Sequence, residues 1–102
     1  MELARDGEVD EVTSELIQQY AGEIRGGGGR LYTAEVRGVR RDDGTWEGRI
    51  VFRPTDGTSP VLSTDRETTQ PDREALAYWA TGLEPLYFDG ALARATDDDG
   101  KT

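Results

Sequence analysis

The sequence contains neither cysteine nor histidine. Without cysteine there is no disulfide and no thiolate nucleophile, which fits a reducing compartment. Without histidine the chain lacks the commonest general base and the main nitrogen ligand of metal ions. Zinc in proteins is bound largely by these two residue types, so only carboxylates remain to hold a metal. We therefore expect no metal and no cofactor.

Long apolar runs are missing as well. No run approaches the roughly 18 residues that a transmembrane helix needs. The N-terminal residues lack the basic start and the apolar stretch of a signal peptide. We expect no membrane contact and a cytoplasmic location.

Positive charge is in the minority: 12 basic residues face 21 acidic ones, and the net charge is −9. A field of this sign repels the phosphates of nucleic acids, so we expect no nucleic-acid binding. One group of arginines is the exception, although acidic residues are interleaved with it. Its members are Arg37, Arg40, Arg41, Arg49 and Arg53.

The clearest pattern in the sequence is a β-hairpin over residues 30–53. Apolar and polar residues alternate along both of its halves, as in half-buried strands. A three-residue loop at Asp42, Asp43 and Gly44 pairs Val36 with Ile50 and brings the apolar sets to one face. A two-residue loop would put them on opposite faces, because a shift of one residue inverts every side chain.

Two stretches have the apolar spacing of helices. Residues 9–25 predict an amphipathic helix that packs on the sheet, with binding to a partner as the alternative. Residues 71–82 predict a second helix, with Pro71 in its first turn and Gly82 at its end. Leu76 and Trp79 belong to its apolar stripe, so we expect this helix to cover one face of the sheet.

The remaining segments complete a single α+β domain over residues 9–95. We expect a small antiparallel sheet, a meander of three strands with a fourth strand near the C-terminus. The other assignments are a frayed N-terminus (1–8), a flexible glycine tether (26–29), a third strand (61–69), a fourth strand or else a short helix (86–95), and a disordered acidic tail (96–102).

No catalytic motif stands out. An enzyme built from these residues would have to use carboxylates, and its acids and bases would come from Glu35, Asp65 or Glu67. Tyr32 or Tyr78 would then serve as proton donors. Nothing in the spacing separates these acids from ordinary surface charge. We therefore expect no enzymatic activity and assign no catalytic residue.

The predicted interaction surface is the outer face of the hairpin. The sequence favours a non-catalytic module that binds another protein or a second copy of itself, in one form by adding a strand to residues 61–69. Two alternatives stay open: a carboxylate-based small-molecule-binding or hydrolytic protein, and an acidic mimic of nucleic acid. The surface comprises Leu31, Glu35, Arg37, Val39, Glu47, Arg49, Val51 and Arg53.

Overall fold

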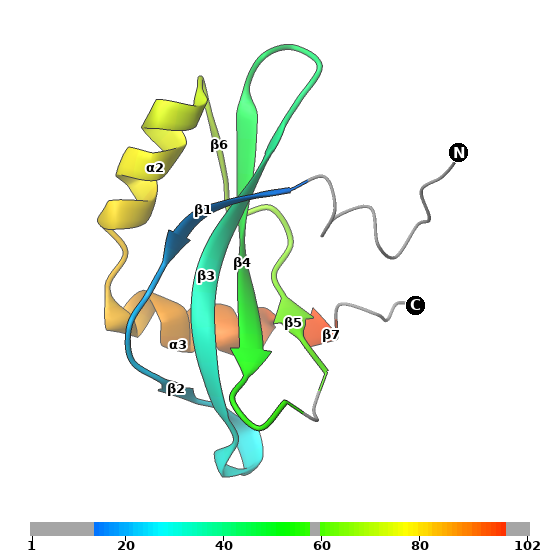
Figure 1. The fold of residues 1–102 in the computed structure, drawn as a ribbon, viewed down its shortest axis with the longest axis vertical. Helices are drawn as coiled ribbons and strands as arrows, with labels where there is room; N and C mark the ends of the chain where they lie inside the picture. The colour runs from blue at the N-terminus through cyan, green and yellow to red at the C-terminus, as the bar shows by residue number, and fades with distance from the viewer. Residues whose placement is uncertain (1–13, 58–59, 98–102) are drawn as a thin grey trace.

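The computed structural model describes residues 14–57 and 60–97. It shows an α+β fold, an antiparallel sheet with two α-helices (Figure 1). Both helices contribute to the same apolar cluster as the inner face of the sheet, so they cover one face and leave the other without a helix in the described part of the chain. The α+β fold and the antiparallel sheet are confirmed.

The centre of the sheet is the predicted hairpin of β3 (Leu31–Arg40) and β4 (Trp46–Pro54). Val36 lies opposite Ile50, as the pattern of burial required. The loop is closed by a hydrogen bond of 2.7 Å from the Arg41 amide to the Thr45 carbonyl, and Gly44 has a φ of 91°. The three-residue loop and the register are therefore confirmed.

Short strands extend the hairpin on both sides, giving seven strands in the described residues. Two of them pair with β3, two pair with β4, and β7 pairs with β5, all antiparallel. They are β1 (Glu15–Gln19), β2 (Ile24–Arg25), β5 (Leu62–Ser63), β6 (Thr68–Gln70) and β7 (Thr96–Asp97).

The predicted helix over residues 9–25 is wrong from residue 15 onward, where the chain forms β1 and β2. Its apolar spacing arises from a strand with irregularities. The register of β1 shifts between Leu16 and Gln18, and Ile17 packs against the core there. Gly22, with a φ of 91°, then redirects the chain into β2. A bulge and a turn thus give apolar residues the spacing of three and four that is typical of a helix.

The predicted segments at the two ends lie mainly outside the described residues. This holds for residues 1–8, for residues 9–13 of the predicted helix, and for residues 98–102 of the predicted tail.

The four glycines form a turn between two paired strands, so the predicted tether to a helix is wrong. The Gly26 amide donates to the Arg30 carbonyl at 2.8 Å, and the Gly29 amide donates to the Gly26 carbonyl at 3.2 Å. Gly27–Gly29 is a single 3-10 turn, η1. Gly28 and Gly29 both have positive φ, which explains why glycine occupies these positions.

The predicted third strand, residues 61–69, is interrupted. It forms β5 and β6, and both run along β4. Between them the chain stays close to β4, because the Thr64 amide donates to the Ile50 carbonyl at 3.0 Å and the Glu67 amide to the Gly48 carbonyl at 2.7 Å. Asp65 and Arg66 project into solvent at the break. β7 pairs with the outer edge of β5, whereas β6 pairs only with β4 among the described residues, so strand addition along residues 61–69 stays a prediction.

The predicted fourth strand over residues 86–95 is wrong, and the helical alternative is right. Pro85–Arg94 forms helix α3, with Pro85 in the first turn, where a missing amide hydrogen costs nothing. Phe88 and Ala91, three residues apart, are its buried residues. The strand that returns to the sheet lies further on, at β7, inside the segment predicted to be a disordered tail.

Helix α2 (Arg73–Thr81) agrees with the prediction for residues 71–82 to within two residues at its start. Its first turn is capped by Asp72, whose carboxylate accepts a hydrogen bond of 2.8 Å from the Ala75 amide. Leu76 and Ala80 are buried against the sheet. Trp79 packs against the core and meets the Tyr87 ring edge-on at 6.3 Å, which joins α2 to α3.

Candidate functional site

Glu35 is a buried carboxylate at the centre of the predicted interaction surface, with 5 % of the residue exposed. It accepts a hydrogen bond of 2.9 Å from Arg37 and two of 3.2 Å from Arg53. Burial alone would raise the pKa of Glu35, but the hydrogen bonds from Arg53 and Arg37 outweigh it, so the pKa lies below its ordinary value. Glu35 is therefore ionised at neutral pH.

The other charges of this face are also joined to one another. Glu47 accepts from Arg41 at 2.8 Å and from Arg49 at 3.3 Å. Arg37 donates in addition to the hydroxyl of Ser14 at 2.7 Å and to its carbonyl at 3.2 Å. The arginines thus bind carboxylates and backbone of their own chain.

The structure places all eight predicted residues together on the outer face of β3 and β4. The apolar members are less exposed than an outer face suggests. Val51 is buried, and Leu31 and Val39 are half-buried. The predicted surface is therefore a layer of paired charges around a small covered centre.

A second buried carboxylate, Glu67, connects the β5–β6 segment to helix α3. It accepts from the Tyr87 hydroxyl at 2.5 Å and from Arg94 at 2.6 and 3.2 Å. Burial works to raise the pKa of Glu67, but hydrogen bonds from Arg94, Tyr87 and Thr64 lower it below the ordinary value. Burial and the Glu67 carboxylate raise the pKa of Tyr87.

Neither buried carboxylate has the environment of a general acid. Such a group needs a pKa raised toward neutrality, whereas Glu35 and Glu67 are held ionised by cationic donors. The remaining acid and base candidates lie elsewhere. Asp65 and Tyr78 are exposed on a loop and on α2, and Tyr32 is buried in the core. The contacts of Glu35 link β3 to β4, and those of Glu67 link the β5–β6 segment to α3.

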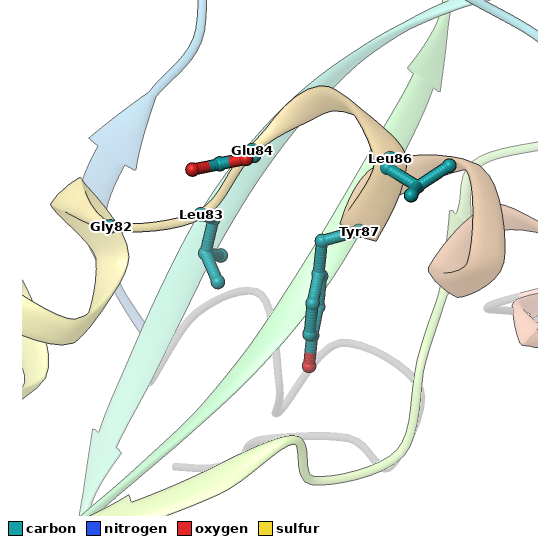
Figure 2. Close-up of a pocket in the computed structure, with 5 residues that line it drawn as sticks. All are labelled: Gly82, Leu83, Glu84, Leu86 and Tyr87. Atoms are coloured by element: carbon teal, nitrogen blue, oxygen red, sulfur yellow. The ribbon is translucent and has the colours of Figure 1, made fainter.

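A hollow of about 380 Å³ lies where α2 passes into α3. It is lined by Gly82, Leu83, Glu84, Leu86 and Tyr87. Figure 2 shows Leu83 and Tyr87 extending in the same direction from the connection, with Glu84 and Leu86 pointing to opposite sides. The hollow is open to solvent and combines apolar side chains with one carboxylate.

Two large apolar residues on the helices are almost fully exposed, Leu86 at 80 % and Tyr78 at 81 %. Tyr78 lies four residues before Gly82, so it projects from α2 about one helical turn from the hollow. Leu86 was not predicted to be a surface residue, because the alternation of residues 86–95 indicated a strand. Pro85 at the first helical position was the signal that favoured the helix.

A second hollow, of about 440 Å³, lies at the tip of the hairpin and is lined by Arg40, Arg41, Asp42 and Asp43. It has no apolar side chain to anchor a partner. A hydroxyl hydrogen bond from Thr45 is the main reason that the pKa of Asp43 is lowered. Among the described residues, no group of three or more acidic side chains is placed to hold a metal ion.

Comparison with known proteins gives no match. No protein-family model matches the sequence, and no curated protein or solved structure matches the chain. The helices of residues 14–57 and 60–97 are nine and ten residues long, too short to span a membrane. Function is therefore inferred from the geometry of the surface.

Proposed function

We propose that this protein is a non-catalytic module that binds another protein through the junction of α2 and α3. We call this region the helical-junction surface; it comprises Tyr78, Leu83, Glu84, Leu86 and Tyr87. The observation that carries the proposal is the exposure of Leu86 in the lining of an open, largely apolar hollow, with the exposed Tyr78 about one helical turn away. Clustered exposed apolar side chains on a small protein often mark a contact site.

The floor of this surface is held in place before any partner arrives. The Tyr87 ring is fixed by the Glu67 carboxylate at its hydroxyl and by edge-on contacts with Trp79 and Phe88 at 6.3 and 6.4 Å. Leu83 packs against the core. A rigid pocket loses little conformational entropy on binding, and anchors seated in such pockets contribute most of the affinity of an interface.

The outer face of the hairpin fits this role less well. Its carboxylates Glu35 and Glu47 already accept from arginines of the same chain, and a partner would have to break those bonds or leave them unused. Binding there, self-association, a cytoplasmic location and the two alternative functions stay predictions.

Site-specific photo-crosslinking in the source cells tests the proposal. A photoreactive phenylalanine analogue at position 86 or 78 should give the same covalent adduct with one protein. Thr55, exposed just beyond β4, is the matched control position and should give none. Position 31 tests the outer face in the same experiment. No adduct at 86 and 78, or an adduct only at 31, would overturn the proposal.

A further inference from the structure

The helical-junction surface contains or adjoins three carboxylates that no cation of the described residues binds. Among the residues that the structure describes, none forms an ion pair or a side-chain hydrogen bond with Glu74, Glu84 or Asp89, and all three are exposed. Glu74 precedes Tyr78 by four residues and Asp89 follows Leu86 by three. Residues at these spacings are neighbours on one face of a helix. Negative charge therefore flanks both exposed apolar residues.

The two arginines of the helices bind carboxylates on other elements of the chain. Arg73 binds Glu15 of β1 at 2.6 Å, and Arg94 binds Glu67 at 2.6 Å. Arg73 is thereby held at β1, and the charge of Arg94 is balanced by Glu67, whose Oε1 also accepts from the Tyr87 hydroxyl. The charge that remains around Leu86 is negative.

We propose that the partner of this surface is a basic, amphipathic segment of a protein, with one large apolar side chain that enters the hollow and lysines or arginines beside it. The inference rests on the proposed function and names the chemistry of the partner. A hollow of about 380 Å³ is at the small end of the range of binding pockets and suits one or two side chains. The apolar anchor supplies affinity, and the charges set orientation and association rate.

A second copy of this chain does not fit the same surface. In a symmetric dimer each patch meets its own image, so Glu84 and its acidic neighbours would face like charges. The net charge of −9 adds repulsion between whole molecules. The carboxylates at the surface and the net charge of the molecule both favour a partner of opposite charge.

Three synthetic helical peptides test this inference. They share one leucine anchor and differ only in flanks of lysine, serine or glutamate. The lysine peptide should shift the amide resonances of Leu83, Leu86 and Tyr87 in the labelled protein. At about 0.15 M salt the serine peptide should bind roughly three- to tenfold more weakly, and raising the salt to about 0.5 M should narrow the difference.

A charge-matched pair of variants localises the effect. Glu84→Lys changes the charge beside the hollow, and Asp42→Lys makes the same change at the exposed hairpin tip. Glu84→Lys should weaken the lysine peptide about three- to fivefold more than Asp42→Lys does. Leu86→Asp should abolish the resonance shifts while the thermal transition stays that of the parent protein, because Leu86 is exposed.

The outcomes separate the two proposals. Crosslinks at position 86 with equal binding of lysine and serine peptides would overturn the basic partner and leave the proposed function standing. Equal effects of Glu84→Lys and Asp42→Lys would also overturn it, because the attraction would then be general. A dimer in sedimentation that Leu86→Asp dissociates would replace the partner with a second copy. Absence of both crosslinks and peptide binding would reject the interaction module itself.

Discussion

At the scale of single residues, two glycines decide how closely helix α2 approaches the sheet. Gly38 and Gly48 lie opposite each other in the central hairpin, and the fully buried Leu76 sits over both. A Cβ atom at Gly38 would come within 2.6 Å of one Leu76 methyl group, and one at Gly48 within 2.7 Å of the other. A side chain at either glycine would therefore require the fully buried Leu76 side chain to move.

Gly48→Ala should therefore lower the free energy of unfolding by about 1–3 kcal/mol, the usual cost of overpacking a core. Denaturant unfolding measures it. Gly90→Ala is the control, since a Cβ there meets no atom within 4 Å. Because Gly90 lies inside α3, this change should stabilise the protein by about 0.5–1 kcal/mol. Unchanged stability of Gly48→Ala would refute the close approach of Leu76.

At the scale of elements, each helix is tied to the sheet by specific polar contacts as well as by apolar packing. The Tyr20 hydroxyl, in the connection between β1 and β2, donates to the Ala80 carbonyl of α2 at 2.6 Å, and burial raises the pKa of Tyr20 to about 12. Glu67 ties α3 through Tyr87 and Arg94. These contacts attach the end of α2 and the first turn of α3, the elements on either side of the hollow.

The start of α2 depends on Asp72. Asp72→Ala removes the acceptor of the Ala75 amide and should cost about 1 kcal/mol, whereas Asp72→Asn retains an acceptor and should cost much less. Thermal unfolding of both variants measures the difference. Equal losses would show that the charge of Asp72 matters and that its cap does not.

The tie of α3 can be tested at Tyr87. Tyr87→Phe keeps the ring contacts, removes the donor to Glu67 and should cost about 1 kcal/mol in the free energy of unfolding. Tyr78→Phe is the matched control. The Tyr78 side chain is exposed, so removing its hydroxyl should change stability little. Denaturant titration of both variants checks this. An equal loss of unfolding free energy in Tyr78→Phe would contradict the stabilising role of the Tyr87–Glu67 hydrogen bond.

At the scale of the whole molecule, two acidic residues link elements that are separate in the chain. Glu35 joins β3 to β4 on the outer face, and Glu67 joins the β5–β6 segment to α3. Both have a pKa below the ordinary value of 4.5. In the unfolded chain they take up protons at higher pH than in the folded protein, so acid favours unfolding.

The unfolding free energy should accordingly be insensitive to these two groups well above pH 4.5 and should fall as the pH drops below it. Glu35→Gln and Glu67→Gln should each lower stability at neutral pH and make the acid decline shallower. Urea titrations at a series of pH values measure both effects. If stability declined as steeply with acid in both variants as in the parent protein, other carboxylates would be its cause.

Much of the central fold was predictable because its causes are local. Alternating residues and the positive φ of Gly44 set the hairpin register, and Pro71 with Gly82 bracketed α2. The edges were not predictable in this way. Ile17 and Tyr20 reach the core through a bulged strand that imitates a helix, and Leu86 belongs to a helix whose apolar residues also suit a strand.

For the candidate site, less could be predicted from the sequence than for the fold. The sequence placed eight residues on one outer face correctly, but it could not show that their charges bind one another or that Val51 is buried. It named Glu67 as a candidate acid without its partners Tyr87 and Arg94, which are 20 and 27 residues away. Such pairings depend on distances that only the packed chain brings about.

By itself, the sequence determined the chemistry available to this protein and the register of its central hairpin. Residue types exclude thiol and imidazole chemistry, and side-chain periodicity with one glycine decides a turn between adjacent strands. Only the tertiary structure decided which strand edges are paired, which carboxylates are bound by arginines and which apolar residues stay exposed at the helical junction. The physical reason is that burial and charge pairing are set by neighbours distant in the chain, whereas the period of a strand is set by residues next to one another.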